Sequence, residues 1–282
     1  MTRLFGVIGY PIGHSLSPVM QTAAFQALRL DALYEPFEVA PRVLAPMLRG
    51  LTLAGVEGLN VTVPLKEAVL PLLDHLDPDA RAIGAVNTIV IRGRRLTGYN
   101  NDGLGLKMAM QELGWRLRPT YAVILGAGGA ARAAAWELLR VRGSCVTIAN
   151  RRLRRAQALA RWLKRAHPHA CIQAVPLSEV ALDEAELLIN ATTVGMRASD
   201  GLPIDARSLR REMLVYDLVY HRQTPLVRAA RRRGCVAANG LSMLLYQGAA
   251  SLRLWLHRAA PIAVMRQALV RTVEGGRWTV EG

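Results

Sequence analysis

The stretch YAVILGAGGAA, from Tyr121 to Ala131, organises the interpretation of the whole chain. Its first five residues are apolar and strand-like, and they lead into a G-x-G-x-x-A pattern formed by Gly126, Gly128 and Ala131. An alanine-rich helical pattern then runs to Arg142. The first glycine permits a sharp turn, the second lets the backbone approach a pyrophosphate, and the small third residue lets helix and strand pack closely. We therefore predict a strand, a tight turn and a helix whose first N–H groups face phosphates, although glycines also end strands that bind no cofactor.

Strand and helix patterns alternate on the C-terminal side of this motif. Such alternation predicts a Rossmann-like, doubly wound parallel sheet within an α/β protein. We expect its strands near residues 121–125, 145–149, 171–175, 187–190, 213–218 and 235–238, and its helices near 129–142, 151–166 and 224–233.

The end of the second predicted strand of this sheet reads Asn150-Arg151-Arg152. A dinucleotide domain that prefers NAD carries a carboxylate here for the ribose 2′-hydroxyl, and this chain has none. An arginine at this position pairs with a 2′-phosphate. The sequence therefore favours NADP over NAD.

Composition limits the class of protein. The chain has 282 residues, enough for two domains, and 51% of them are hydrophobic, which argues against disorder. The N-terminus does not resemble a signal peptide, and no apolar run reaches membrane-spanning length, so we expect a cytoplasmic protein with no membrane partner. The histidines lack metal-ligand spacing, so we expect no metal. We interpret the three cysteines as small buried residues in a reducing compartment: Cys145, Cys171 and Cys235.

The net charge of +15 permits two interpretations. The arginine runs at 151–155 and 231–233 are compatible with a nucleic-acid-binding module. Both runs lie in helical patterns whose apolar residues face inward, and no nucleic-acid-binding motif accompanies them. We therefore expect a solvated basic surface with no nucleic-acid partner, which attracts small anions.

In the N-terminal half we expect strands near 4–9 and 33–39 and helices near 18–29 and 43–54. The loop after the first strand carries Ser15 and Ser17, two residues apart. In an extended backbone their hydroxyls project to the same side and form a cradle for a carboxylate. The alternative is that Ser17 only caps the helix that begins at Pro18.

Asn60 and Thr62 would share one face of a strand that leads to Lys66. Ligands bind at the carboxyl ends of strands in open α/β sheets, but a lysine there is a surface charge by default. We expect a helical segment over 66–76, bent at Pro71, and then a hairpin with strands at 86–91 and 96–99. Asp102 is well placed as the N-cap of a helix over 103–113, and this structural role alone would explain an aspartate at this position. Two further helices are expected at 241–257 and 262–272.

A set of segments along nearly the whole chain resembles the shikimate/quinate dehydrogenase family, and shikimate dehydrogenase in particular. The segments are GYPIGHSLSP (9–18), GLNVTVPLK (58–66), IGAVNTI (83–89), GYNNDGLG (98–105), GAGGAA (126–131), NRR (150–152), NATTVGM (190–196), YDLVY (216–220) and GLSMLLYQ (240–247).

The resemblance implies a reversible, NADP-dependent reduction of 3-dehydroshikimate to shikimate, a step in chorismate and aromatic amino acid biosynthesis. It implies that Lys66 and Asp102 are the catalytic pair. The substrate site is then lined by Ser15, Ser17, Asn60, Thr62, Asn87, Tyr220 and Gln247. The residues implied for the cofactor are Gly126, Ala127, Gly128, Gly129, Ala130, Asn150, Arg151, Arg152, Thr192, Gly240 and Met243.

The resemblance also implies two domains. Residues 1–103 and 240–282 would form a discontinuous substrate-binding and catalytic domain, and residues 104–239 the NADP-binding domain. We expect a monomer or homodimer.

The chain departs from the family pattern at three places. Gln21-Thr22 replaces His-Asn, Asn101 replaces the usual threonine before the catalytic aspartate, and Arg222 replaces a proline. Asn101 keeps open a quinate/shikimate dehydrogenase or an amino-shikimate relative. From a different class, a silent NADP-sensing regulator is also open, but the presence of both Lys66 and Asp102 argues against it.

Overall fold

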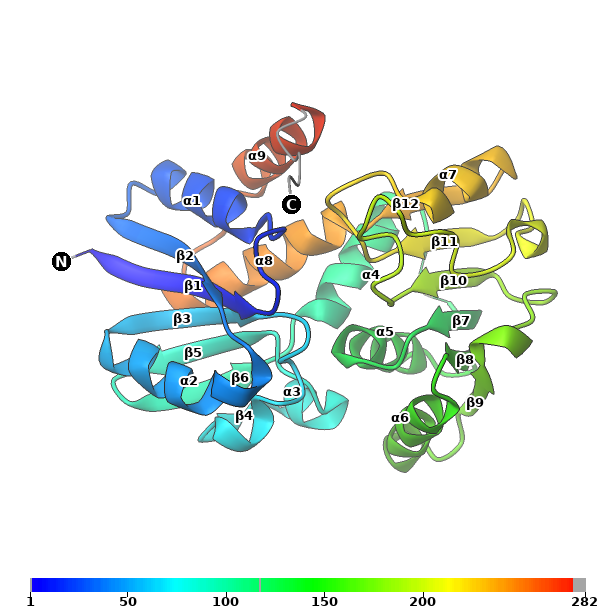
Figure 1. Cartoon of the computed structure of the whole chain (residues 1–282), viewed down its shortest axis with the longest axis horizontal. Coiled ribbons are helices and arrows are strands. Elements are labelled where there is room, and N and C mark those ends of the chain that lie inside the picture. The colour runs from blue at the N-terminus through cyan, green and yellow to red at the C-terminus, as the bar shows by residue number, and fades with distance from the viewer. Residues whose placement is uncertain (1, 117, 276–282) are drawn as a thin grey trace. The chain divides into compact units, whose positions relative to one another are not determined.

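The computed structural model describes residues 2–116 and 118–275 of the chain (Figure 1). The chain divides into two compact units, Met1–Gly105 with Leu244–Gly282, and Leu106–Met243. The divisions fall inside helices α4 (Asp102–Glu112) and α8 (Leu241–Leu256).

The first unit is built on a mixed sheet with the strand order β2-β1-β3-β5-β6-β4. Strand β1 is parallel to β2 and β3, whereas β5 is antiparallel to both β3 and β6. The strands are β1 Arg3–Gly9, β2 Ala32–Glu38, β3 Val56–Val61, β4 His75–Leu76, β5 Thr88–Arg92 and β6 Arg95–Tyr99. The helical segments are α1 Ser17–Ala27, η1 Pro41–Val43, α2 Leu44–Leu53, η2 Leu70–Leu72, α3 Pro78–Ile83 and α9 Ile262–Glu274.

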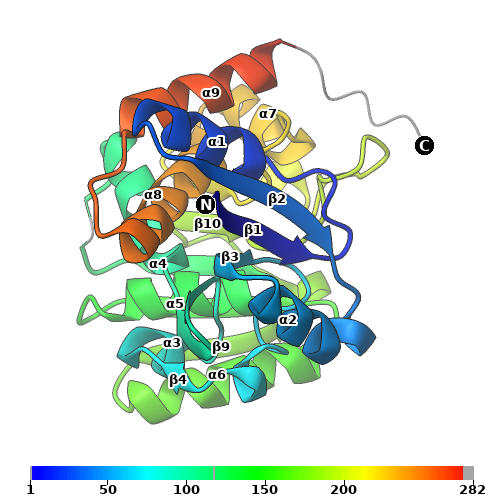
Figure 2. The same cartoon turned by 90° about the vertical axis from the view of Figure 1, so that its left-hand side faces the viewer.

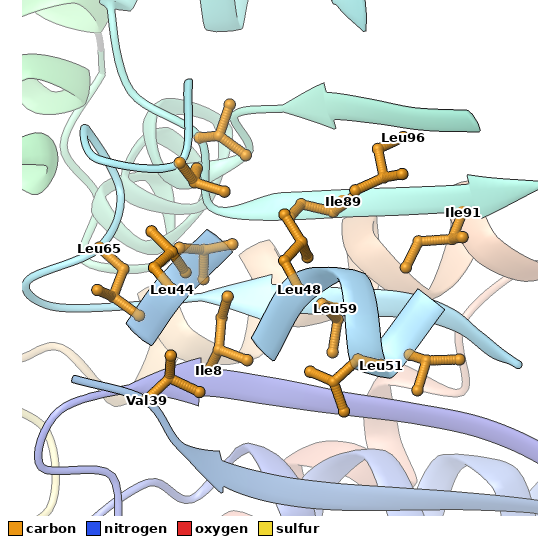
Figure 3. Packing of buried hydrophobic residues seen from close by; sticks show 14 of the residues in the cluster. Ile8, Val39, Leu44, Leu48, Leu51, Leu59, Leu65, Ile89, Ile91 and Leu96 are labelled. Atoms are coloured by element: carbon orange, nitrogen blue, oxygen red, sulfur yellow. The ribbon is translucent and has the colours of Figure 1, made fainter. Parts of the chain in front are cut away.

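Helix α2 covers one face of this sheet. Its leucines recur at helical spacing, so one stripe of the helix is apolar and packs inward. Leu44, Leu48 and Leu51 are buried against residues of the sheet such as Leu59 and Ile89 (Figure 3). This core fixes the strands whose ends carry the polar residues of the first unit.

Helix α8 packs on the sheet through Trp255. Its indole N–H donates to the carbonyl oxygen of Ile89 at 2.9 Å, and a Cβ on Gly58 would lie 2.2 Å from the indole nitrogen. Gly58 is therefore required for the close approach of the indole to β3. Helices α1 and α9 lie side by side in the same unit (Figure 2).

The helix predicted over residues 66–76 is wrong. This segment forms turns, the short 3₁₀ helix η2 and the two-residue strand β4. Pro71 and the loss of N–H donors at prolines oppose a continuous helix. Leu65 and Val69 are nevertheless fully buried, because they pack into the core beneath α2.

The second unit is a parallel sheet with the order β12-β11-β10-β7-β8-β9, so the predicted doubly wound fold is confirmed. Successive strands extend from β7 in one direction, then β10 returns to the other side of β7, which makes these two strand ends a topological switch point. The strands are β7 Tyr121–Leu125, β8 Cys145–Asn150, β9 Cys171–Pro176, β10 Leu187–Asn190, β11 Leu214–Asp217 and β12 Val236–Asn239. The helical segments are α5 Gly129–Leu139, α6 Leu153–Ala166, η3 Leu177–Glu179, η4 Ala206–Ser208 and α7 Pro225–Arg232.

The arginine-rich helices of this unit are amphipathic, as predicted. On α6, Ala156, Leu159 and Leu163 are buried while Arg154 and Arg155 are exposed. The arginines therefore belong to a solvated face.

The cysteine interpretation is wrong for two of the three residues. Cys235 is buried, but Cys171 is exposed and Cys145 is partly exposed. Cys145 and Cys171 are register partners on β8 and β9. The contact with the Cys171 thiol and burial together raise the pKa of Cys145 to about 11.

Within residues 2–116 and 118–275, the structure contains no helix that is both long enough and apolar enough to cross a bilayer.

Candidate active site

A buried ion pair stands at the centre of the polar residues of the first unit. Lys66 Nζ donates to Asp102 Oδ2 at 2.6 Å, with side-chain exposures of 13% and 4%. The backbone holds the lysine in place, because its carbonyl oxygen accepts the Val86 N–H at 2.8 Å. Lys66 is therefore not the exposed surface charge that its local sequence suggested.

Asp102 begins α4, but its carboxylate is not used as a helix cap. Its second oxygen, Oδ1, accepts the side-chain amide of Asn87 at 2.8 Å. The Asp102 N–H is instead bound by Asn100 Oδ1 at 3.0 Å. Asn100 thus satisfies the helix start and leaves both carboxylate oxygens of Asp102 for Lys66 and Asn87.

Asn87 links the ion pair to helix α8. It directly precedes β5 and is 1% exposed. Its Nδ2 donates to Gln247 Oε1 at 3.2 Å. The structure therefore brings together four residues that the resemblance implied for catalysis and substrate: Lys66, Asn87, Asp102 and Gln247.

Asn60 lies on β3 near the same group, but its side chain is committed to protein partners. Its Oδ1 accepts the Tyr34 hydroxyl at 2.7 Å, and its Nδ2 lies 2.9 Å from Ser251 Oγ. Thr62 follows the end of β3, where it is partly buried and its N–H donates to Ile8 O at 2.9 Å.

The serine loop differs from the extended geometry predicted for it. Leu16, between the two serines, has helical backbone angles, and Ser15 closes a turn on Ile12. Ser17 makes no capping hydrogen bond; instead its N–H donates to Ser15 Oγ at 3.3 Å. The capping alternative for Ser17 is therefore wrong, and both residues remain largely buried at 8% and 5% exposure.

Three buried polar residues of this cluster were not predicted: Tyr34, Thr88 and Ser251. A signal for Ser251 was available, because Gln247, Ser251 and Trp255 recur every four residues and so share one face of α8. Thr88 starts a strand whose next three residues are apolar, and a buried hydroxyl at this position requires a hydrogen-bond partner.

The two glycines of the glycine-rich turn in the second unit have different surroundings. Gly126 has φ +108°, and a Cβ there would lie 2.8 Å from the carbonyl oxygen of Ala191, just after β10. A Cβ on Gly128, by contrast, would meet no atom within 4 Å. The backbone at Gly128 is thus open to a close ligand at the topological switch point.

Helix α5 begins at Gly129, directly after this turn. The Arg132 N–H donates to Gly128 O at 2.9 Å, so the N–H groups of Gly129, Ala130 and Ala131 have no intrahelical acceptor. Together with Ala127, these positions form a helix N-terminus suited to a phosphate.

The remaining cofactor positions lie at other strand ends of this unit. Asn150 ends β8, where its Nδ2 donates to Arg152 O at 3.0 Å, and Arg151 and Arg152 are exposed. Thr192 follows β10 and its Oγ1 donates to Asn190 Oδ1 at 2.6 Å.

Gly240 follows β12, where a Cβ would lie 2.4 Å from Leu218 O, so only glycine fits. Met243 in α8 is 7% exposed. Tyr220 follows β11 in the second unit, with its ring centroid 6.1 Å from that of His221.

The chemistry available to the first unit is proton transfer beside a developing negative charge. An ammonium held by a carboxylate supplies both a proton and a favourable charge. Over the part of the chain that the structure covers, no cluster of three or more His, Cys, Asp or Glu residues is arranged to hold a metal ion.

Comparison with known proteins gives three family matches in the order of the chain. Residues 7–89 match the shikimate dehydrogenase substrate binding domain, 107–213 match shikimate / quinate 5-dehydrogenase, and 240–270 match the shikimate 5'-dehydrogenase C-terminal domain. The chain is also 44% identical over 280 residues to the shikimate dehydrogenase (NADP(+)) of Symbiobacterium thermophilum, an alignment that covers 97% of this chain and 95% of the relative.

Two solved structures are similar over almost their whole length. The Thermus thermophilus shikimate 5-dehydrogenase, in complex with NADP(H) and shikimate, has a TM-score of 0.85 and 38% identity, covering 96% of this chain and 100% of that one. The Corynebacterium glutamicum quinate dehydrogenase, in complex with NAD, has a TM-score of 0.85 and 31% identity, covering 95% and 99%. The chain therefore belongs to the shikimate dehydrogenase family.

Proposed function

We propose that the chain is an NADP-dependent shikimate dehydrogenase, which reversibly reduces 3-dehydroshikimate to shikimate in chorismate and aromatic amino acid biosynthesis. The observation that carries this proposal is the buried 2.6 Å ion pair of Lys66 and Asp102, with Asn87 on the other carboxylate oxygen. Family membership supports the same activity.

Lys66 is the proposed proton donor. NADPH, when bound, would supply a hydride to the ketone carbon of the substrate, so negative charge would develop on the ketone oxygen. The Lys66 ammonium stabilises this charge and transfers its proton to that oxygen. Asp102 orients the ammonium and accepts a hydrogen bond from a hydroxyl of the substrate.

The substrate is an anion, and we assign its carboxylate to the hydroxyls of Ser15 and Ser17. Neutral hydroxyls satisfy a carboxylate without burying an opposing charge. Thr62, Asn87, Gln247 and Tyr220 are proposed to contact the ring of the substrate. Residues 1–103 and 240–282 would then form the substrate domain.

We assign NADP to the domain formed by residues 104–239, together with Gly240 and Met243 just after it. The open backbone at Gly128 and the first turn of α5 would hold the pyrophosphate, since a side chain is excluded at Gly126 and N–H groups are available from Gly129 onward. The exposed guanidinium of Arg151, with Arg152 beside it, would pair with the 2′-phosphate. Asn150, Thr192, Gly240 and Met243 would complete this site.

Quinate is the second candidate substrate, because one of the matched family descriptions names both compounds. Asn101 stands next to Asp102 and its Nδ2 donates to Thr88 Oγ1 at 3.2 Å. That bond turns the amide toward the protein, so we expect Asn101 to leave the preference for shikimate unchanged.

We further propose that the enzyme works in the cytoplasm, as a monomer or homodimer, without a nucleic-acid partner. The exposed arginines of α6 support an attraction for small anions such as the substrate and the cofactor.

An assay at the absorbance band of NADPH tests the proposal, with shikimate and quinate each tried with NADP and with NAD. We expect the highest kcat/KM for shikimate with NADP. A higher value for quinate would make quinate the substrate, and no reduction of either cofactor by either compound would overturn the proposed reaction.

A further inference from the structure

A continuous chain of buried hydrogen bonds links Tyr34 to the carboxylate of Asp102. The side chains between them come from β3, from β5 and the residue before it, and from α8, and each is at most 5% exposed. In order along the chain of bonds, these intermediate residues are Asn60, Ser251, Thr88 and Asn87.

The orientation of the Asn87 amide is determined by its neighbours. Its Oδ1 lies 2.9 Å from the backbone N–H of Asn101, and a backbone N–H can only donate. Its Nδ2 therefore faces Asp102 Oδ1 at 2.8 Å and Gln247 Oε1 at 3.2 Å. The flipped amide would place an oxygen against the carboxylate and an NH₂ group against an N–H.

The Thr88 hydroxyl reinforces this orientation. It lies 2.9 Å from Asn87 Oδ1, which carries no hydrogen, so the proton of this bond belongs to Thr88. A hydroxyl has one proton, so in its 2.7 Å contact with Ser251 the threonine accepts and the serine donates. Asn101 Nδ2 donates to the same threonine oxygen at 3.2 Å.

The far end of the chain is oriented in the same way. Asn60 Nδ2 faces the carbonyl oxygen of Asn87 at 3.1 Å and Ser251 Oγ at 2.9 Å, so its Oδ1 is left to accept the Tyr34 hydroxyl at 2.7 Å. Ser251 Oγ also donates to Gln247 O in its own helix at 2.9 Å, so its single proton is shared between this carbonyl oxygen and Thr88 Oγ1. Apart from this shared proton, each bond of the chain has its donor on the Tyr34 side and its acceptor on the Asp102 side.

We propose that Thr88 and Ser251 are positioning residues for the reaction: they lock the Asn87 amide with its Nδ2 on Asp102, and so fix the carboxylate that orients Lys66. Asn60 belongs to the same buried scaffold, because its Oδ1 accepts from Tyr34 and its Nδ2 donates to Ser251. The inference rests on the proposed function, since it needs Lys66 and Asp102 to be the reacting pair.

Thr88→Val tests the proposal, because valine keeps the shape of the side chain and removes the hydroxyl. We expect kcat for shikimate oxidation to fall roughly 10- to 100-fold, since a misplacement of about 1 Å has an effect of this order. The Kd for shikimate, measured by calorimetry on the full chain, should change less than about threefold, because the substrate contacts remain. The kinetic isotope effect with shikimate deuterated at the oxidised carbon should increase, because the chemical step becomes slower.

Two variants separate positioning from packing. Thr88→Ser keeps the hydroxyl, so its kcat should stay within about threefold of that of the wild type. Thr52→Val removes a hydroxyl that bonds Leu48 O at 2.8 Å on α2, remote from the chain of bonds, and should leave kcat and the isotope effect unchanged.

A wild-type kcat and isotope effect in Thr88→Val would overturn the proposal, and so would equal losses in Thr88→Val and Thr88→Ser. If Thr88→Val does not fold, Ser251→Ala replaces it, with a smaller loss of about threefold to tenfold expected because Asn60 and Asn101 still donate to Thr88. A wild-type rate in Ser251→Ala would then overturn the proposal. Failure of the proposed function is distinct, because the wild-type protein itself would not oxidise shikimate.

Discussion

In the first unit the candidate site consists of buried side chains that bond to one another, whereas in the second it consists of glycines, open backbone and exposed arginines. Lys66 and Asp102 are paired at 2.6 Å beneath the surface. Gly128 faces open space and Arg151 is exposed. The first site therefore depends on contacts between its side chains, whereas the second depends largely on glycines that leave the backbone uncovered.

This difference predicts opposite sensitivities to substitution. Removing a side chain from the first site breaks a pre-arranged contact, so the loss should be in catalysis or in substrate binding. Adding a side chain to the second site fills the space that a phosphate needs, so the loss should be in cofactor affinity.

Lys66→Ala should have the largest effect. Without the ammonium, the developing oxyanion loses both its proton donor and its nearest positive charge, so kcat should fall by on the order of 10² to 10⁴. Steady-state kinetics with shikimate measures it, and Lys164→Ala on the exposed face of α6 is the matched control. A loss confined to KM would make Lys66 a binding residue only.

Gly126→Ala and Gly128→Ala test whether the glycine-rich turn of the second unit tolerates a methyl group. Alanine at 126 would adopt a left-handed conformation and lie 2.8 Å from Ala191 O, which costs about 1–3 kcal/mol of stability. Alanine at 128 fits without a clash but occupies the ligand side of the turn. We expect both variants to bind NADP about 10- to 100-fold more weakly, and only Gly126→Ala to have a lower Tm.

Titration calorimetry and thermal unfolding of the same samples measure these two effects. Unchanged NADP affinity in Gly128→Ala would show that the phosphates lie elsewhere. An equal Tm for the two variants would contradict the strain assigned to position 126.

Arg151→Ala should weaken NADP selectively. Hydrogen bonds to a charged phosphate contribute about 1.5–3 kcal/mol, so KM for NADP should rise about 10- to 100-fold while KM for NAD stays constant. An equal change for both cofactors contradicts a role in binding the 2′-phosphate.

Ser15→Ala should have a smaller effect, in the substrate unit. Loss of one hydroxyl to the carboxylate is expected to raise KM for shikimate about tenfold with little change in kcat. The KM for NADP serves as the internal control. An unchanged KM for shikimate would remove Ser15 from the carboxylate site.

Much of the fold could be predicted from the sequence because its signals are local. The apolar run before Gly126 and the alternation after it were enough to predict the parallel sheet. The segment at 66–76 failed because Leu65 and Val69 are buried by contacts with α2, not by membership of a helix. The spacing of apolar residues does not distinguish a residue on the buried face of a helix from a residue of an irregular segment that packs into the core.

The residues of the site were harder to predict from the sequence, because their contacts join segments that are far apart in the chain. Thr88 and Ser251 are 163 residues apart, and no spacing rule connects them before β5 and α8 pack together. Local signals for Lys66 and Asp102 favoured a surface charge and a helix cap. Only the resemblance to a family pointed to the pair, and the structure places them in contact.

Two buried carboxylates, Asp102 in the first unit and Asp217 in the second, have different environments. Asp102 faces the ammonium of Lys66, whereas Asp217, at the end of β11, accepts hydrogen bonds only from neutral groups within the described ranges: Thr224 Oγ1 at 2.6 Å, Asn190 Nδ2 at 2.9 Å and the Val219 N–H at 3.1 Å. Burial raises the pKa of Asp217 to about 6, and the hydrogen bonds only partly offset this.

The stability of the protein should therefore respond to pH through Asp217. A carboxyl whose pKa is higher in the folded state than its ordinary 3.8 binds its proton first in that state, so stability rises as pH falls from about 6 toward 4. The full effect is at most about 3 kcal/mol. The Tm difference between the wild type and Asp217→Asn, measured from pH 7.5 to 4.5, should shift by a few °C in favour of the wild type, because the variant cannot titrate at this position. A constant difference would mean that the three neutral donors fully offset the cost of burying the Asp217 charge.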